Sequence, residues 1–593
     1  MRALHHPPAR KLHRFKGGIR LPGHKSISTE RLIHRLPLTG KYVVPLRQHI
    51  GSAATPLVRR GDHVLKGQRI GLPQGPLSTA VHAPTSGKVI AVEHRPVPHP
   101  SGLSDLCVVI VADGQDESVP MPPIDWRKME PAALRQLIRD QGLVGLGGAV
   151  FPSHVKLEPP PGRPIHTLIL NGAECEPWIT CDDRLMREHA AEILEGAAVM
   201  RHLLQAQEVL VGIEDNKPEA IAAMRWAASS MSFPIEVVAV PSLYPAGGGK
   251  QLTYTLTGRE TPSGGLTTDI GVQVFNVGTA YALHRLIHLG EPVISRLVTV
   301  TGHVLYPGNY EVRIGTPVHN LLRAAGGVLR ESNGLIVGGP MMGFELADDH
   351  APVVKGVNCI LVKDPENFPA PPPPLPCIRC GECARVCPVE LQPFEMYWYS
   401  RARDFGKAQA YNLFDCIECG CCSHACPSHI PLVSYFRYAK SEIWAREHEK
   451  QASDRARAQH EFHLFRLERE KREKAEKLGK KAGERIDSIT ADDPDAARKQ
   501  AILQAAIERA RLAREATQAR NTDNLTAEQQ REIAEIDRRR SQRTAPPASP
   551  ALGSGAPDES TVADATEPPT ADPSSGASSS PPLPAPTEGG RRP

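Results

Sequence analysis

Short apolar runs alternate with helical patterns through the middle of the chain, roughly residues 125–290. The runs HTLIL, EVLVGI and IEVVAV have the length and β-branched content of strands, and DDRLMREHAAEILEGAAVMRHLL and KPEAIAAMRWAASS separate them as helices. Ahead of them, PAALRQLIRDQG places Leu134, Leu137 and Ile138 on one helix face. This alternation predicts an α/β domain with a parallel sheet covered on both faces, whose ligands lie at the carboxyl ends of the strands. Those ends carry the segments NGAECEP and EDN.

The regions on either side of this domain have a β pattern. After an N-terminal arm, residues 1–40, the segments RRGDHVLKGQRIG and VHAPTSGKVIAVEH within residues 41–120 predict two halves of a small sandwich, with turns at Gly61, Gly67 and Gly87. They resemble the barrel-sandwich hybrid, or hammerhead, domains that carry lipoyl or biotinyl groups. The Met-Lys-Met type turn is missing, which favours a structural module over a swinging arm. Within residues 295–350, strand, turn, strand and a helix around Leu321 predict a β-grasp unit like the SLBB domain.

The C-terminal part of the chain has a different composition. The proline run FPAPPPPLP, residues 368–376, is typical of a semi-rigid linker. Residues 441–545 are largely charged and rich in Ala, so we expect long solvated helices with intrahelical ion pairs. Residues 546–593 have too few large apolar side chains to offset the entropy of ordering, which predicts a disordered tail.

Length and charge exclude some classes of function. With 593 residues, the chain is expected to fold as a multidomain protein. Its 70 basic and 66 acidic residues give a net charge of +4, too small to indicate nucleic-acid binding. The sequence has no run of about 18 apolar residues, and its basic start lacks an apolar signal core. We therefore expect a location in the cytoplasm, where clustered cysteines more often hold metal than form disulfides.

Eight of the 13 cysteines follow C-x2-C-x2-C-x3-C-P twice, within residues 377–440. This is the spacing of bacterial ferredoxins, in which the fourth cysteine of each run binds the cluster of the other run. On that rule one [4Fe-4S] cluster is held by Cys377, Cys380, Cys383 and Cys426, and the second by Cys416, Cys419, Cys422 and Cys387. Zinc is the alternative, but two C-x2-C pairs supply all four thiolates of a zinc site, and here eight are present.

Two further features concern this cysteine module. Cys421 lies outside the repeated spacing, beside the ligand Cys422, and we interpret it as a packing residue. The segment between the two runs, residues 388–415, has a helical pattern with an aromatic face. A helical dicluster ferredoxin domain is therefore predicted, and two clusters held this close favour electron relay over substrate chemistry.

The glycine-rich segment GLVGLGGAVFPSHVK is the best candidate for a site that supplies electrons to these clusters. A dinucleotide fingerprint requires a preceding strand, whereas a helix precedes the glycines here, so a glycine turn without a ligand remains the alternative. Together with NGAECEP, the segment could offer backbone N–H groups and Lys156 to a phosphate, and polar side chains to a flavin.

Five segments identify a family resemblance. In order, GLGGAVFPSHVKL, LILNGAECEPWITCDDRLM, YPAGGGKQLTYTLTGRE, VFNVGTAYALHRLI and the twin cysteine runs resemble RnfC, also called RsxC, the peripheral subunit of the Rnf ion-translocating oxidoreductase, over residues 12–445. The resemblance implies a peripheral protein on the cytoplasmic side of the cell inner membrane. Its expected partners are NADH and the other subunits of the Rnf/Rsx complex, which would provide the membrane contact, and no nucleic acid.

The glycine loop and NGAECEP are also similar to the flavin-binding subunit of respiratory complex I. Departures from that subunit are Leu146 for an Arg, Ala173 for an Asp, Val150 for a Gly usual in both families, and the lack of paired glutamates in YPAGGGKQL. These departures concern the NADH contacts more than the phosphate cradle. Carried onto this chain, the resemblance implies that FMN is bordered by Gly145, Gly147, Gly148, Lys156, Asn171, Glu174 and Asn276, and that Phe151 and Glu176 lie towards the nicotinamide nucleotide.

The function that the resemblance implies is electron input. NADH would reduce FMN, bound without a covalent link, and electrons would pass singly to the two [4Fe-4S] clusters and on to membrane subunits that translocate ions. Because the cofactors carry this chemistry, no catalytic acid or nucleophile is expected from the protein. The resemblance also allows a role in keeping a redox-sensing transcription regulator reduced. A relay or scaffold subunit without a working flavin site is the alternative.

Overall fold

Four parallel strands form the sheet expected in the middle of the chain. They are β9 (Thr167–Gly172), β10 (Glu208–Glu214), β11 (Ile235–Val240) and β12 (Val272–Asn276), in the order β11-β10-β9-β12. The first three coincide with the predicted runs, whereas β12 was not predicted as a strand. Because β10 and β12 flank β9 on opposite sides, the connections diverge there, and a crevice is expected at the carboxyl ends of β9 and β12.

Helices cover both faces of this sheet. Leu168 and Leu170 of β9 pack with residues of α5 (Ala190–Leu204), α6 (Pro218–Ala228) and α8 (Val277–Leu289), whereas Ile169 packs with α7 (Gly249–Thr257). The predicted helix ahead of them, α2 (Pro131–Asp140), buries Leu134 and Ile138. One predicted helix is two: α4 (Cys181–Glu188) ends at His189, and α5 begins at the next residue. The sheet covered on both faces is confirmed.

The N-terminal domain is a β sandwich. One sheet contains β2 (Lys41–Pro45), β8 (Ser104–Ala112), β7 (Gly87–Pro96) and β4 (His63–Val64), and the other β3 (Thr55–Pro56), β5 (Arg69–Leu72) and β6 (Val81–His82). Val44, Ile70 and Ile110 are fully buried between them. Gly61 and Gly67 have φ values of 102° and 79°, which suit turns. Gly87 is not a turn residue, because it begins β7, where a side chain would overlap the Val111 carbonyl.

A six-stranded mixed sheet forms the β-grasp region. The predicted strand, turn, strand and helix are β13 (Ser295–Gly302), β14 (Gly308–Arg313) and α9 (Val318–Ala324). β15 (Leu335–Val337), β16 (Phe344–Leu346) and β17 (Cys359–Val362) complete the order β1-β14-β13-β17-β15-β16. β17 lies past residue 350, and β1 (His34–Arg35) comes from the N-terminal arm, which also contains α1 (Ser26–Thr29). The arm is therefore part of this sheet.

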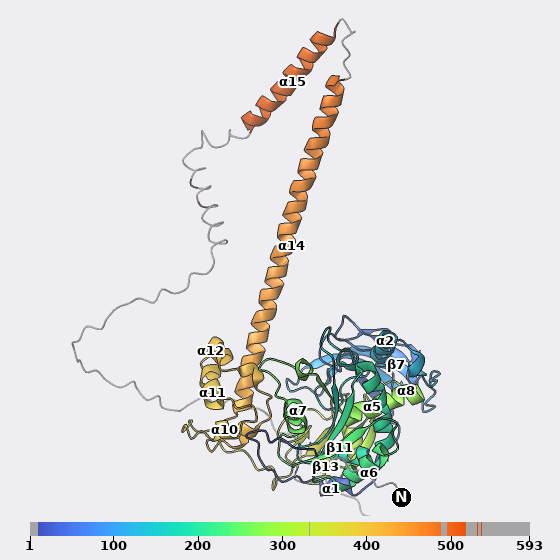
Figure 1. Cartoon of the computed structure of the whole chain (residues 1–593). Coiled ribbons are helices and arrows are strands. Elements are labelled where there is room, and N and C mark those ends of the chain that lie inside the picture. The colour runs from blue at the N-terminus through green and yellow to red at the C-terminus, as the bar shows by residue number, and fades with distance from the viewer. Residues whose placement is uncertain (1–9, 331, 488–494, 518–530, 532–534, 536–593) are drawn as a thin grey trace, which may run out of the picture. The chain divides into compact units, whose positions relative to one another are not determined.

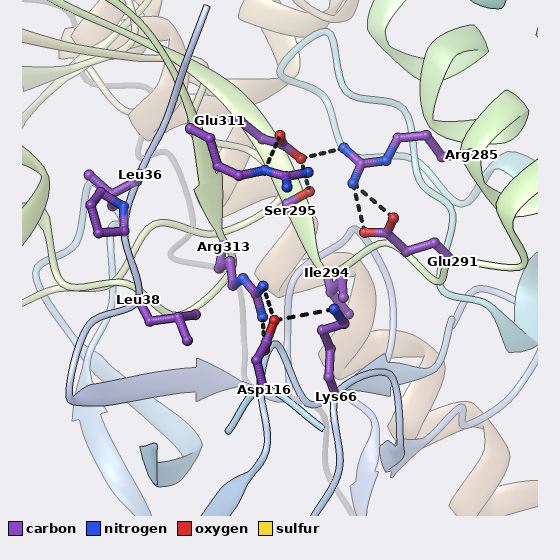
Figure 2. A pocket seen from close by; sticks show the side chains of 12 residues that line it. Leu36, Leu38, Lys66, Asp116, Arg285, Glu291, Ile294, Ser295, Glu311 and Arg313 are labelled. Atoms are coloured by element: carbon purple, nitrogen blue, oxygen red, sulfur yellow. Dashed lines mark hydrogen bonds and ion pairs between the residues drawn. The ribbon is translucent and has the colours of Figure 1, made fainter. Parts of the chain in front are cut away.

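Ion pairs join these three domains around a polar pocket of about 330 Å³ (Figure 2). Arg313 of β14 donates to both carboxylate oxygens of Asp116, at 2.5 and 2.6 Å, and Lys66 of the sandwich domain pairs with the same carboxylate at 3.2 Å. Arg285 of α8 pairs with Glu291 and Glu311. Burial acts to raise the pKa of Glu311, but Arg285, Ser295 and Arg35 together lower it to about 2. This network fixes the domains that surround the candidate site.

The cysteine-rich module is helical, as predicted. It contains α10 (Glu382–Arg385), α11 (Pro393–Arg401), α12 (Phe405–Ala410), α13 (Cys421–His424) and the start of α14 (Leu432–Asp487). Met396, Leu413 and Phe436 form its core with several of the cysteines. The described residues also include three short 3-10 turns, Trp126–Lys128, Thr267–Ile270 and Leu413–Asp415, and α3 (Ser153–Lys156) follows the glycine loop.

The computed structural model describes residues 10–330, 332–487, 495–517, 531 and 535, in two units, residues 1–458 and 459–593 (Figure 1). The second unit contains the remainder of α14 and α15 (Ala496–Thr517). Intrahelical ion pairs such as Arg469–Glu473, at 3.4 Å, and an exposed Phe462 fit the predicted solvated helices. The predicted tail, residues 546–593, lies outside the described residues. Among the helices described, none combines the length and apolar character required to span a bilayer.

Candidate functional site

A large cavity opens at the carboxyl ends of β9 and β12, with a volume of about 1360 Å³. Its walls are the glycine loop, the two strand ends, residues 245–251 and, from the β-grasp region, residues 337–344. Eight of the nine residues assigned to FMN or NADH line it: Gly147, Gly148, Phe151, Lys156, Asn171, Glu174, Glu176 and Asn276. The cavity therefore brings together the glycine loop, NGAECEP and β12, which are far apart in the sequence.

Gly145, the ninth of these residues, closes the glycine loop without lining the cavity. Its N–H donates to the Phe151 carbonyl at 2.8 Å, so the loop folds back on itself. A Cβ at Gly147 would lie 3.1 Å from Cβ of Asn276, which shows how closely the loop approaches β12. Gly148 has φ 106° and open space around it. These two glycines leave the cavity side of the loop bare, as close approach of a ligand to backbone requires.

Val150 adopts φ 44°, in the left-handed region that β-branched residues rarely occupy. The Gly usual in the related families has no steric penalty there. The departure at Val150 therefore adds strain to the loop, of about 1–2 kcal/mol. The other departures lie off the cavity wall. Leu146 is buried against α8, where its N–H donates to Thr279 at 2.9 Å, and Ala173 is fully buried with its carbonyl accepting from Lys217 at 2.7 Å.

Lys156, at the end of α3, is a buried cation on the cavity wall. Its ammonium donates to the Val274 carbonyl and lies 4.4 Å from the centre of the Phe275 ring. Burial lowers its pKa to about 8. Among the described residues, no carboxylate forms an ion pair with it. A buried cation that faces a cavity without a counter-ion is a suitable partner for a phosphate.

Asn171 and Asn276 position the backbone around the cavity. The Asn171 amide donates to the Gly247 carbonyl at 2.8 Å and accepts from Ala173 N–H at 3.1 Å. Asn276 caps α8 by accepting from Gly278 N–H at 2.8 Å, and its amide donates to Asp182 at 2.5 Å. Both side chains fix neighbouring segments, and the N-terminus of α8 lies at the cavity, where its free N–H groups favour anions.

Glu174 and Glu176 are held by backbone N–H groups. The Glu174 carboxylate accepts from Asp182 and Asp183 N–H at 2.6 and 3.2 Å and so caps α4. Glu176 accepts from Met341 and Met342 N–H at 2.7 and 3.0 Å. Burial raises the pKa of both carboxyls. The β-grasp region therefore positions one of the residues assigned to the nicotinamide nucleotide.

Sequence reasoning missed Lys25, in the N-terminal arm. Its ammonium donates to the carbonyls of Glu174, Glu176 and Ile179 at 2.8, 2.9 and 2.7 Å, and burial lowers its pKa. The three bonds hold the NGAECEP turn in place. No sequence signal marks this role, because Lys25 lies about 150 residues from its partners. The segment EDN, expected near the ligand, does not line the cavity, because β10 lies on the side of β9 away from β12.

Four of the predicted cluster ligands line one small cavity in the cysteine module: Cys387, Cys416, Cys419 and Cys422. They combine the second triplet with the last cysteine of the first run, which is the predicted crossed set. Burial raises the pKa of Cys422 above its usual range, and the neighbouring thiols of Cys416, Cys419, Cys387 and Cys383 add to the shift. Iron binding requires the thiolate forms, so cluster assembly here would release protons.

The other predicted set lies nearer the surface. Burial raises the pKa of Cys383 to about 11, with contributions from Cys380 and Cys426, which are therefore its close neighbours. Cys380 is exposed, and Cys377 and Cys426 are partly buried. Cys421 is fully buried but lies in a different cluster, with Tyr244, Ile19 and Met341. Its position agrees with a packing role between the cysteine module and the flavin domain.

One residue borders both sites. Ile417, between Cys416 and Cys419, lines the large cavity and also the small cavity formed by the crossed cysteines. The two modules are joined around it. Tyr244 hydroxyl donates to the Cys419 carbonyl at 2.7 Å, and Asp415 accepts from Gly264 N–H at 2.9 Å. A flavin in the large cavity would therefore be adjacent to the second cysteine run.

Four family models match consecutive parts of the chain. They are the RnfC barrel sandwich hybrid domain at residues 13–115, the Nuo51 FMN-binding domain at 138–285, the SLBB domain at 297–345 and a 4Fe-4S dicluster domain at 376–430. The expected fold class is confirmed by these matches. They also identify FMN and two [4Fe-4S] clusters as the cofactors, and the buried Lys156 and the crossed cysteine cavity fit these groups.

Curated relatives share a single description, as the RnfC component of an ion-translocating oxidoreductase complex. The Pseudomonas aeruginosa protein is 49% identical over 76% of this chain and 58% of its own length, and the Edwardsiella ictaluri protein is 48% identical over 76% and 56%. The Haemophilus influenzae protein is 45% identical over 76% and 68%. The chain thus spans little more than half the length of the first two. Among solved structures, a chain of an NAD⁺-reducing [NiFe]-hydrogenase matches with a TM-score of 0.36 and 21% identity, over 47% of this chain and 54% of its own.

Proposed function

Because this chain belongs to the RnfC family of ion-translocating oxidoreductase components, we propose that it is the electron-input subunit of such a complex. In this role it accepts electrons from NADH at FMN and passes them through two [4Fe-4S] clusters to other subunits. The observation that carries the proposal is Ile417, which lines both the large cavity and the crossed cysteine cavity. A flavin site and a cluster site that share a wall residue are suited to electron transfer between them.

The glycine loop and Lys156 bind the FMN phosphate in this proposal. The bare backbone at Gly147 and Gly148, the N-terminus of α8 and the buried ammonium of Lys156 all favour an anion. FMN supplies the step from two-electron to one-electron chemistry when it is bound. The protein's contribution is to bind the cofactor, to exclude water from it and to hold it next to the second cysteine run.

Glu176 and Phe151 border the nicotinamide nucleotide in the same proposal. The support is geometric: both line the cavity, and Glu176 is fixed by two N–H groups from residues 341 and 342. The cavity volume of about 1360 Å³ exceeds that of an ordinary small-ligand pocket, which leaves room for a nucleotide beside a flavin. The remaining volume lies towards Leu266 and Thr267, near the surface.

The clusters act in a defined order. The set of Cys416, Cys419, Cys422 and Cys387 lies next to the flavin cavity and receives the electron first. The set that contains the exposed Cys380 lies second and delivers the electron to a partner. The partners are the other subunits of the complex, which hold this subunit peripherally on the cytoplasmic side of the inner membrane.

A spectroscopic experiment tests the proposal. The full chain is purified anaerobically with its clusters, its flavin content is measured, and the iron–sulfur absorbance is followed after NADH is added. Bound FMN and loss of this absorbance on NADH addition are expected. Clusters without flavin, in protein supplied with FMN, would contradict the proposal and leave the relay alternative. Dithionite serves as the control that reduces the clusters without the flavin site.

A further inference from the structure

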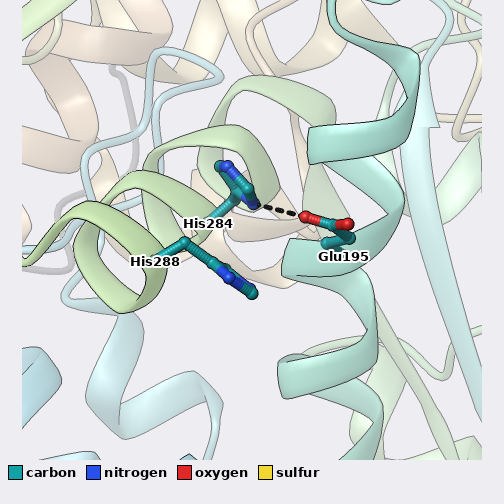
Figure 3. A group of neighbouring side chains, drawn as sticks. All are labelled: Glu195, His284 and His288. Carbon is teal, nitrogen blue, oxygen red and sulfur yellow. Dashed lines mark ion pairs between the residues drawn. The ribbon is translucent and has the colours of Figure 1, made fainter. Parts of the chain in front are cut away.

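Two helices on the outer side of the flavin domain bring two histidines and a glutamate together. His284 and His288 lie one turn apart on α8, and Glu195 faces them from α5 (Figure 3). One ligand atom from each of the three lies within 4.8 Å of the other two. None of these residues lines the flavin cavity or the cluster cavity. The group is therefore separate from the electron-transfer site.

The geometry of the group is close to that of a metal site. His284 Nδ1 lies 2.9 Å from Glu195 Oε2, and the two imidazole rings are stacked with centroids 4.5 Å apart. Ligand atoms 2.0–2.1 Å from a tetrahedral ion would be about 3.3 Å apart. Small rotations of surface side chains would reach this spacing, since the Glu195 side chain is 46% exposed. The stacked imidazoles give two nitrogens on one helix face, at the spacing of a helical two-histidine site.

Charge and protonation also suit a cation. Among the described residues, Glu195 has no Lys or Arg within ion-pair distance, and His284 is its only partner. Burial lowers the pKa of His284, with a smaller contribution from His288, which favours the neutral imidazole that metals bind. Glu192, one turn earlier on α5, pairs with His189 at 3.1 Å and adds negative charge nearby.

We propose that Glu195, His284 and His288 bind one divalent transition-metal ion of the Zn²⁺ class, with water completing the coordination. Two imidazoles and one carboxylate form a borderline ligand set that suits zinc, whereas thiolates would be needed for softer ions. The ion would tie α5 to α8, the helix whose first turn borders the flavin cavity. Its role would be structural, because this set holds the ion away from the flavin and the clusters.

The competing site is the second histidine group in the chain. His319, Asp349 and His350 in the β-grasp region also place three ligand atoms within 4.8 Å. There, however, His350 Nδ1 lies 3.0 Å from Asp348 and 3.3 Å from Asp349, so two adjacent carboxylates already satisfy one ring nitrogen. Variants of the two groups can be compared directly, because each has an exposed member.

Zinc binding to the full chain tests the proposal. Untagged protein with its clusters and flavin is treated with a mild chelator, supplied with zinc sulfate, desalted and analysed for zinc. One zinc per chain is expected in the wild type and in His350→Ala, and loss of that zinc in His288→Ala and in Glu195→Gln. No retained zinc in the wild type, or loss in His350→Ala instead, would overturn the proposal.

X-ray absorption at the zinc edge identifies the ligands without interference from iron. Nitrogen and oxygen neighbours at about 2.0–2.1 Å are expected, whereas sulfur at about 2.3 Å would place the ion on cysteines and overturn the proposal. Iron content and circular dichroism of His288→Ala should match the wild type, which separates loss of the ion from loss of the fold. The NADH response does not enter this test, so it can fail or succeed independently of the proposed function.

Discussion

The Tyr244 hydroxyl donates a 2.7 Å hydrogen bond to the carbonyl oxygen of Cys419. Tyr244 belongs to the segment that precedes the glycines of YPAGGGKQL, and Cys419 is a predicted ligand of the cluster nearest the flavin cavity. The ring is almost completely buried, and the N-terminal arm bonds to the same residue through Ile19 N–H at 2.9 Å. This contact fixes the cavity wall to the cluster loop without a covalent link.

Tyr244→Phe should weaken this junction while it leaves the flavin site intact. Removing the hydroxyl leaves the buried Cys419 carbonyl without this donor, at a cost of about 1–3 kcal/mol. We expect reduction of FMN by NADH at the wild-type rate, followed by slower reduction of the clusters, measured by stopped-flow absorbance. Tyr254→Phe, in the adjacent helix α7, is the control. Equal cluster reduction in both variants would show that the bond has no part in electron transfer.

Cys387→Ala should affect the cluster held mainly by the second run. Its sulfur lines the cavity of Cys416, Cys419 and Cys422, so the variant should lose the same iron and the same electron paramagnetic resonance signal as Cys419→Ala. Cys421→Ala should retain both clusters, because that side chain packs against Tyr244 and Met341. A Cys387→Ala spectrum that matched Cys380→Ala would refute the crossed assignment.

Local patterns predicted the elements of the fold correctly where each has its own sequence signal. The three strands from HTLIL, EVLVGI and IEVVAV, the helix over Leu134 and Ile138, and the helical cysteine module follow from periodicity and spacing. β12 was missed because VQVF is short and leads directly into α8. The break at His189 was missed because apolar residues continue on both sides of it.

The candidate site was predicted only in part, because several of its walls come from distant segments. The glycine loop and NGAECEP were recognisable by composition. Lys25 and residues 338–344 carry no local signal, since their role depends on how the arm and the β-grasp region pack against the flavin domain. The strain at Val150 likewise appears only once its φ is known, although the family pattern marked the position.

Binding of FMN should weaken as pH rises above 8. Burial lowers the pKa of Lys156 to about 8 in the free protein, and a bound phosphate would raise it. Below pH 8 the ammonium is charged before and after binding, so affinity is greatest there. Above pH 8 the free protein must take up a proton to bind, and affinity should fall by up to about tenfold per pH unit.

Fluorescence titration with FMN between pH 7 and 9.5 measures this dependence. Riboflavin, which lacks the phosphate, should bind with little change over the same range, as should FMN to Lys156→Met. A fall in affinity that was equal for FMN and riboflavin would place the titrating group elsewhere.

Gly339→Ala should impair the response to NADH through Glu176. A Cβ at Gly339 would overlap the side chain of Glu176, which is held by Met341 and Met342 N–H. The carboxylate must then move, while the glycine loop, Lys156 and the cysteines keep their positions. We expect normal FMN content and iron content but a raised KM for NADH. Gly308→Ala, where the nearest atom to a new Cβ is 3.9 Å away, is the control in the same region. An unchanged KM in Gly339→Ala would argue against a nucleotide contact at Glu176, and a loss of FMN would place Glu176 at the flavin instead.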